Sequence, residues 1–254
     1  MAEDSTGRTK NKFASYEKKY TEGGWQYDYA REYKRVKTIT DAIGLKPGAT
    51  VLEIGCGEGF HSQLLYDLGF RVTGNEMTDA GVRNARKNHP TVNYIQGDSL
   101  SLVDILPLEH FDMILARGHS WYHYHLTEDD PRGINPPAKT RRMFDLIKPG
   151  GHFVLVIRTD FTGTHPEKAV SNNTRQAYVD LFSPFGEIVY VTDRHMQPLP
   201  DEAAARASGK GIVIATRKPG GRREGRKLPP PIERALRTMR KVSKRLARRA
   251  ELRT

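Results

Sequence analysis

Short apolar segments alternate with helical segments along residues 47–218, and this alternation constrains the fold more than any other feature of the sequence. The strand-like segments are "ATVLEIG", "FRVTGNE", "VNYIQGD", "FDMILARG" and "GHFVLVIRTD". The helical segments between them are "FHSQLLYDLG", "DAGVRNARKNH" and "RRMFDLI". Strands that alternate with helices form βαβ crossovers, whose strands lie parallel in one sheet. The pattern therefore predicts an α/β fold with a doubly wound, mostly parallel sheet.

Two further strands end the predicted sheet. A helix expected over residues 174–182 precedes the strand "EIVYVTDRHM", and "GIVIATRK" follows after a polar connection. Parallel neighbours need a crossover of a dozen or more residues, usually a helix. This connection is too short for a crossover helix of the usual length. We therefore expect a seven-stranded sheet in which the last strand runs antiparallel.

The chain divides into an N-terminal arm with a helical cap, the sheet domain, a Gly/Arg/Pro linker and a basic helix: residues 1–45, 46–218, 219–231 and 232–254. The first dozen residues are polar, and we expect them to be disordered. The helical part of the cap begins after the break at Gly23-Gly24 and ends at Gly44.

The formal net charge of +11 is concentrated in the C-terminal tail. Residues 217–254 carry 15 Lys and Arg against 3 Glu; subtraction from the totals of 41 and 30 leaves 26 basic and 27 acidic residues in residues 1–216. Within the tail, apolar residues recur at steps of three and four: Ile232, Leu236, Met239, Val242 and Leu246. Residues 222–253 are therefore predicted to form a tether for a polyanion or an anionic membrane surface. The alternative is a solvated basic face on a helix that packs against the core.

The cellular compartment follows from cysteine content and hydropathy. The single cysteine, Cys56, excludes a framework of internal disulfides. No export signal begins the chain, and no apolar stretch approaches the roughly 20 residues that span a bilayer. We therefore expect a soluble, cytoplasmic protein whose basic tail can contact a membrane surface peripherally.

Three glycines alternate in "VLEIGCGEGF", between the first strand and the helix after it: Gly55, Gly57 and Gly59. In a doubly wound sheet this turn lies at the carboxyl ends of the strands, where glycines let the backbone approach a nucleotide-like ligand. Glu53 precedes the loop, and Glu76 ends the second strand, 21 residues after Gly55. An acid at the end of the second strand can accept ribose hydroxyls. Asp98, after the third strand, can accept from the exocyclic amine of adenine.

This ordered set resembles the class I S-adenosylmethionine-dependent methyltransferases over roughly residues 47–218. "LEIGCGEG" is similar to their glycine-rich motif, "VTGNEM" to the segment of their ribose-binding acid, and "LIKPGGHFVLV" to the lead-in of their fifth strand. The resemblance implies a Rossmann-like sheet and S-adenosylmethionine as the cofactor. It implies a cofactor site formed by Glu53, Gly55, Cys56, Gly57, Gly59, Glu76, Met77, Asp98, Ser99 and Ala116.

Individual roles at this site also follow from the resemblance. Glu53 would help to hold the amino end of the cofactor's methionine portion. Cys56 is interpreted as a small residue that fits the loop, since no partner base for a nucleophilic thiol is indicated. Tyr20 and Trp25 are candidates to close over the cofactor from the N-terminal cap, although core packing would explain both rings as well.

An NAD-dependent dehydrogenase is the alternative interpretation of the glycine loop. Its motif is G-x-G-x-x-G, and here the third glycine comes one residue too early. In addition, Glu53 would oppose a bound pyrophosphate. Both points favour the methyltransferase interpretation.

The segment "ARGHSWYHYH" begins at the carboxyl end of the fourth strand, the edge that faces both cofactor and acceptor. We expect His119 to be the general base that accepts a hydroxyl proton, because neutral imidazole titrates near pH 7. His123 is the second candidate. The wall of the acceptor pocket is predicted to contain Arg117, Trp121, Tyr122 and Tyr124. The alternative is aromatic loop packing with solvated histidines.

A metal site is a third interpretation of this segment. His119 and His123 lie one helical turn apart, and three further ligand types follow: His125, Asp129 and Asp130. Metal-dependent methyltransferases use mainly oxygen ligands for a hard cation. The acid expected at the end of this strand is replaced by Arg117, so no metal is predicted.

The acceptor itself is not determined by the sequence. Residues 135–137, "NPP", resemble the turn with which nucleic-acid amino-methyltransferases grip a flipped base, but Ala138 follows instead of an aromatic ring. We interpret the triplet as a loop turn. The predicted function is O-methylation of a small-molecule or sugar hydroxyl. Two alternatives stay open. The first is a methyltransferase that acts on a nucleic acid, protein or membrane-associated glycan recruited by the tail. The second is a non-catalytic scaffold.

Overall fold

The computed structural model describes residues 5–123, 125–129, 133–163, 172–209 and 211–220. A compact unit spans Met1–Gly220. The predicted linker and basic helix fall almost entirely on residues 221–254, outside the described residues, and Tyr124 and Asp130 also lie outside them. Among the described residues, no helix is both long enough and apolar enough to cross a membrane.

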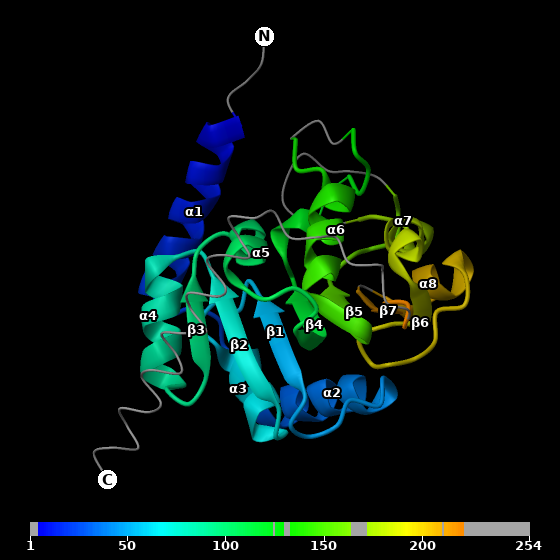
Figure 1. Ribbon diagram of the computed structural model, residues 1–254. Helices are drawn as coiled ribbons and strands as arrows, with labels where there is room; N and C mark the ends of the chain where they lie inside the picture. Colours follow the sequence, from blue (N-terminus) through cyan, green and yellow to red (C-terminus); the bar gives the residue numbers. More distant parts are fainter. Residues whose placement is uncertain (1–4, 124, 130–132, 164–171, 210, 221–254) are drawn as a thin grey trace, which may run out of the picture. The chain divides into compact units, whose positions relative to one another are not determined.

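The described residues form one seven-stranded sheet: β1 (Thr50–Ile54), β2 (Arg71–Glu76), β3 (Asn93–Gln96), β4 (Phe111–Arg117), β5 (Ile147–Ile157), β6 (Glu187–Thr192) and β7 (Ile212–Arg217). The strand order is β3-β2-β1-β4-β5-β7-β6 (Figure 1). The first five strands pair in parallel, and β7 lies antiparallel between β5 and β6. The predicted doubly wound sheet with an antiparallel last strand is confirmed.

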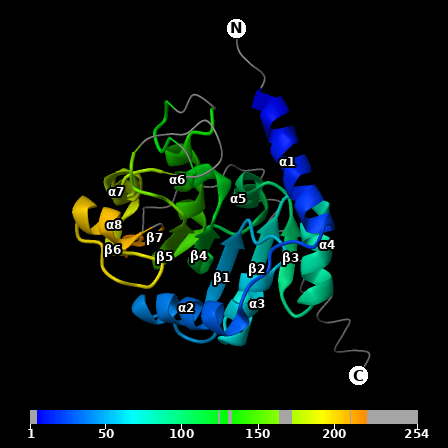
Figure 2. The same ribbon diagram turned by 180° about the vertical axis from the view of Figure 1, so that it is seen from behind.

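Helices cover both faces of this sheet (Figures 1 and 2). On one face lie α2 (Tyr29–Ala42), α3 (Phe60–Asp67) and α4 (Asp79–Asn88), whose buried residues share a core with Val51, Met113 and Val154. The other face carries α5 (Leu102–Ile105), α6 (Pro136–Leu146), α7 (Arg175–Phe182) and α8 (Glu202–Ser208). Alternate residues of the central strands therefore enter two separate cores, as expected for a sheet buried on both sides.

The N-terminal arm contains a helix, α1 (Ser5–Thr21), so the expectation of disorder over the first dozen residues is wrong from Ser5 onward. The helix is held by contacts with distant residues. The carboxylate of Glu17 accepts hydrogen bonds from the backbone N–H of Ala80, at the N-terminus of α4. Tyr20 is 7 % exposed. Figure 2 shows α1 lying against α4 at the β3 edge of the sheet.

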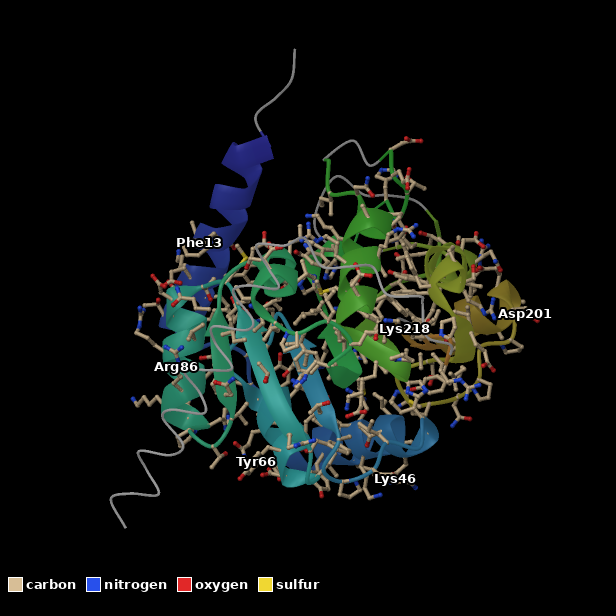
Figure 3. The ribbon with its side chains drawn as sticks, viewed as in Figure 1. Phe13, Lys46, Tyr66, Arg86, Asp201 and Lys218 are labelled. Carbon is tan, nitrogen blue, oxygen red and sulfur yellow. The ribbon has the colours of Figure 1, made fainter. Side chains whose placement is uncertain are left out.

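Two loop expectations also change. Asn135 caps the N-terminus of α6 through a hydrogen bond from Ala138 N–H, and the two prolines occupy the first turn, where the missing N–H groups are not needed. "NPP" is therefore a helix start rather than a simple loop turn. The connection from β6 to β7 holds the seven-residue helix α8, although β7 still enters antiparallel. Lys218, labelled in Figure 3, lies just beyond β7 and donates to the backbone oxygens of Phe144 and Ile147.

Candidate active site

The glycine loop links β1 to α3 at the carboxyl edge of the sheet. Gly57 and Gly59 have φ values of 55° and 80°, in the left-handed region that favours glycine. A Cβ atom at Gly57 would lie 2.6 Å from the hydroxyl oxygen of Tyr20, and one at Gly59 would overlap the Tyr94 hydroxyl. Two tyrosine rings thus close around the loop, so both positions require glycine for space as well as for conformation.

Glu76, at the end of β2, is tied to this loop. Its Oε2 atom accepts a hydrogen bond from Gly57 N–H at 3.1 Å, and its Oε1 atom accepts from the N–H and hydroxyl of Thr78 at 2.9 and 2.8 Å. A carboxylate has about four acceptor directions, and these three bonds leave one on Oε2. In this arrangement Glu76 can accept one further hydrogen bond.

Tyr20 completes this part of the site from α1. Burial, and after it the charge of Glu76, raises the pKa of its hydroxyl. The ring also lies 3.3 Å from the place of a Cβ at Gly81. The structure therefore brings Tyr20 to the glycine loop, as the proposal that Tyr20 closes over the cofactor required.

Glu58, inside the glycine loop, fastens the rest of the N-terminal arm. Its carboxylate accepts hydrogen bonds from Trp25 N–H at 3.2 Å and from Asn84 Nδ2 at 2.8 Å. Gly24 has a φ of 65°, and a Cβ there would lie 1.5 Å from Glu58 Oε2. The Trp25 side chain is 53 % exposed and lies beneath Lys19. The arm therefore meets the loop through its backbone at Trp25, and sequence reasoning missed Glu58 although it lies within the motif.

Glu53 is buried behind the glycine loop and 2 % exposed. Burial raises the pKa of its carboxyl group to about 7, although a hydrogen bond from Ser62 Oγ at 2.5 Å and the charge of Arg117 act to lower it. At neutral pH this group is therefore poised between its two protonation states. Ser62 was not predicted; a hydroxyl residue in the first turn of the following helix is the only sequence signal for it.

The other predicted cofactor residues lie along the same edge. Cys56 is 8 % exposed, and burial raises the pKa of its thiol. Ala116 is fully buried and pairs with Ile54. Asp98 is exposed and caps a short helical turn by accepting from Leu100 N–H at 2.9 Å. Met77 is half-buried after Glu76.

His119 lies over the glycine loop, because its Cδ2 atom is 2.9 Å from the place of a Cβ at Gly55. Its Nε2 atom is 3.4 Å from Ser99 Oγ. Asn75, on β2, donates through Nδ2 to the oxygens of Ile95 and Gly97, so its Oδ1 atom accepts the Ser99 hydroxyl at 2.6 Å. Ser99 Oγ is then left to accept from His119.

This network determines the tautomer of His119. Since Nε2 donates the proton that Ser99 accepts, Nδ1 is the acceptor atom of the ring, and it faces the N–H of Trp121 at 3.5 Å.

Within the rest of the aromatic segment, Trp121 and Tyr122 lie deeper than His119, whereas His123 is half-buried like it. The His123 Nε2 atom is 3.0 Å from the oxygen of Gly118. Trp121 is 7 % exposed and packs edge-on against His119. Tyr122 is fully buried; its hydroxyl meets Thr140, and its ring packs against Phe153 and Phe182. For Tyr122 this geometry favours the packing alternative. Among the described residues, no cluster of three His, Cys, Asp or Glu could hold a metal ion.

Arg117 points toward α2. Its guanidinium lies 3.6 Å from Glu32, 3.4 Å from the Tyr27 hydroxyl and over the Tyr27 ring. Burial alone would raise the pKa of Glu32, but the hydrogen bond with His61 and the charges of Arg117 and Arg35 lower it to about 2. Burial lowers the pKa of His61 to about 4. His61 is therefore neutral at pH 7, and its 3.4 Å contact with Glu32 is a hydrogen bond rather than an ion pair.

Comparison with known proteins agrees with this architecture. Residues 45–212 match a family described as a methyltransferase domain. This match covers more than half of the chain, which therefore belongs to that family. The predicted resemblance to class I methyltransferases is confirmed.

Individual relatives are more distant. A ubiquinone biosynthesis O-methyltransferase from Pseudomonas fluorescens is 31 % identical over 121 residues, which cover 46 % of this chain and 47 % of the relative. An S-adenosyl-L-methionine-dependent Diels-Alderase from Talaromyces variabilis is 26 % identical over 139 residues, 54 % of this chain and 46 % of the relative. The matched part of the chain thus spans about half the length of these curated relatives.

Solved structures show the same fold. The [4+2]-cyclase SpnF has a TM-score of 0.57 at 18 % identity and covers 78 % of this chain and 87 % of its own. An S-adenosylmethionine-dependent methyltransferase from Methanosarcina mazei has a TM-score of 0.55 at 18 % identity, with coverage of 72 % and 97 %. The family and the curated relatives support S-adenosylmethionine as the cofactor.

Proposed function

We propose that this protein is a methyltransferase that moves a methyl group from S-adenosylmethionine to a hydroxyl group of a small molecule. The observation that carries the proposal is the convergence of the glycine loop, Glu76 and Asp98 at the carboxyl ends of the neighbouring strands β1, β2 and β3. Ligands of open α/β sheets bind at this edge.

The residues present fit this cofactor. At Gly57 and Gly59 the loop backbone passes so close to the Tyr20 and Tyr94 hydroxyls that a Cβ would collide with them, so glycine is needed for the loop to take this course at the sheet edge. Glu76 keeps one acceptor direction for a ribose hydroxyl, and the exposed Asp98 is open to the adenine amine. Ionised Glu53 supplies a negative charge behind the loop, for the ammonium end of the methionine portion. Met77, Ser99 and Ala116 are assigned to the walls between these groups.

The acceptor side is assigned to His119. When bound, S-adenosylmethionine supplies an electrophilic methyl carbon on a sulfonium. His119 Nδ1 would take the proton of the acceptor hydroxyl as that oxygen is methylated. A hydroxyl acceptor is also supported by relatives that are named O-methyltransferases.

An acceptor screen tests this proposal. Purified protein would be incubated with labelled S-adenosylmethionine and panels of phenols, hydroquinones and sugars, and the methylated products identified by mass spectrometry. His119→Ala should lower turnover by roughly 10²- to 10⁴-fold and leave cofactor binding unchanged. His110→Ala, at the opposite end of β4, is the matched control. Unchanged turnover in the His119 variant would refute the base and leave His123 as the candidate.

We also propose that residues 222–253 tether the protein to a polyanion or an anionic membrane surface. The sequence supports this role through the charge of +12 in residues 217–254, against −1 in the rest of the chain. Such a tether would serve the alternative function, methylation of a macromolecule that carries negative charge. Vesicle co-sedimentation at low and high salt, with and without anionic lipid, tests it directly.

A further inference from the structure

Three arginines follow the carboxyl ends of three parallel strands. Arg117 ends β4, Arg158 comes directly after β5, and Arg194 is the second residue after β6. β5 and β6 run parallel to each other because each pairs antiparallel with β7. The three arginines therefore emerge at the same edge of the sheet, the edge at which ligands of this fold bind.

Helix α2 brings a fourth arginine to this edge together with one acid. Arg35 Nη1 donates to both carboxylate oxygens of Glu32 at 2.7 and 2.9 Å, and Arg35 Nε donates to the backbone oxygen of Arg194 at 3.1 Å. Glu32 also pairs with Arg117. We call Arg35, Arg117, Arg158 and Arg194 the arginine cluster. Arg35 and Arg117 also line a small cavity against Met113, Leu115 and Val156.

Among the described residues, Glu32 is the carboxylate that pairs with the arginine cluster. It is ionised at pH 7 and is shared by Arg35 and Arg117. Neutral His61 adds no charge. The carboxylates of Asp193 and Asp160 accept hydrogen bonds from groups outside the cluster: Asp193 Oδ1 from the N–H groups of His195 and Gln197, and Asp160 Oδ1 from Thr162.

Two guanidinium groups of the cluster have no acceptor among the described residues. Within the described part of the chain, no hydrogen bond or ion pair is made by the side chain of Arg158, which is exposed, or of Arg194, which is half-buried against Gly211. Burial, and then the charges of Arg35 and Arg117, lowers the pKa of Arg194. Half-buried cations that repel one another favour a bound anion.

We propose that the arginine cluster binds an anionic group, a carboxylate or a phosphate, of the methyl acceptor. The part of this inference that identifies the anion as a group of the methyl acceptor rests on the proposed function, whereas anion binding itself does not. Planar guanidinium groups match the oxygens of both anions. Arg117, the last residue of β4, and His119, two residues later, both lie at the carboxyl edge of the sheet, the edge to which the acceptor hydroxyl is assigned. Acceptors that carry a negative charge are thereby selected.

Calorimetric titration tests this site without the cofactor. Inorganic phosphate and benzoate would be titrated, at constant ionic strength, into the wild-type chain and into Arg158→Gln and Arg194→Gln. Each variant should weaken binding of the preferred anion roughly tenfold or more, as expected for loss of a charge-assisted hydrogen bond. Arg206→Gln, an exposed arginine on α8, is the matched control and should bind like the wild type. The basic tail is present in every chain, so its contribution is common to all.

The outcomes separate the two anions and the two proposals. Tighter binding of phosphate assigns a phosphorylated acceptor, and tighter binding of benzoate assigns a carboxylic acid. Equal dissociation constants in the wild type and both cluster variants, or no binding of either anion to the wild type, would overturn the site. If Arg194→Gln does not fold, the exposed Arg158 still provides the test. S-adenosylhomocysteine would be titrated into the same chains; its failure to bind would refute the proposed function but not the anion site.

Discussion

The buried Glu53 makes stability and cofactor binding depend on pH in opposite directions. Burial raises the pKa of its carboxyl group from the ordinary value of 4.5 to about 7. The native state therefore favours the protonated form. The contribution to stability is fully present below pH 4.5 and is lost as the pH rises through about 7. The difference between the two pKa values corresponds to a loss of about 3 kcal/mol in the free energy of unfolding at alkaline pH.

Glu53→Gln tests this account, because glutamine keeps an oxygen for the Ser62 hydroxyl and cannot ionise. The variant should unfold with a free energy that no longer falls between pH 5 and 8, and at pH 8.5 it should be more stable than the wild type by up to about 3 kcal/mol. Denaturant titrations across this pH range measure both chains. Equal pH dependence in the two chains would show that Glu53 does not titrate there.

The same substitution should weaken binding of the cofactor. If ionised Glu53 attracts the ammonium group, affinity of the wild type for S-adenosylhomocysteine should rise tenfold per pH unit below about pH 7 and then level off. Glu53→Gln should lose this dependence and bind roughly 10- to 150-fold more weakly at pH 8. Calorimetry at each pH measures it. A variant that gains stability and also keeps full affinity would refute the role of Glu53 in binding.

Three other predictions follow from the geometry. Gly24→Ala places a Cβ on the Glu58 carboxylate and should weaken S-adenosylhomocysteine binding and expose the arm to trypsin. Gly23→Ala is the control for backbone strain, because Gly23 also has a positive φ but its Cβ would meet open space, so it should leave the Glu58 contact intact. His119→Ala should bind the cofactor normally but turn over roughly 10²- to 10⁴-fold more slowly in the acceptor assay. A chain shortened to residues 1–220 should keep its melting temperature and cofactor affinity while losing salt-sensitive binding to anionic vesicles; unfolding on truncation would make the tail structural.

The sheet could be predicted from the sequence because its signals are local. Each strand is a short apolar run, and glycines such as Gly44 and Gly69 end the helices at left-handed positions. Helix α1 was missed for the opposite reason. Its sequence is polar, and the contacts that hold it, Glu17 at α4 and Tyr20 at Gly57, join residues far apart in the chain.

The residues of the candidate site also divide into those marked by a local motif and those brought together only by the fold. Glu76 and Asp98 could be proposed from the sequence because they stand at fixed places in an ordered motif. The arginine cluster was not, because Arg35, Arg158 and Arg194 come from three separate segments that only the folded sheet brings together. The sequence offered one signal for it, a charged residue at the end of an apolar strand.

The aromatic segment shows a further limit. Its irregular loop has no periodicity from which burial can be inferred. The fully buried Tyr122 therefore could not be separated from the half-buried His119, which lies at the loop.

Cofactor choice is the most direct test of the central claim. The full-length protein would be titrated with S-adenosylhomocysteine and, separately, with NAD, without added metal. The account predicts one S-adenosylhomocysteine per chain and no binding of NAD. Glu76→Ala should weaken the former by about 1–3 kcal/mol through loss of a charge-assisted hydrogen bond to ribose, with its melting temperature measured to establish folding. Binding of NAD in place of S-adenosylhomocysteine would contradict the account.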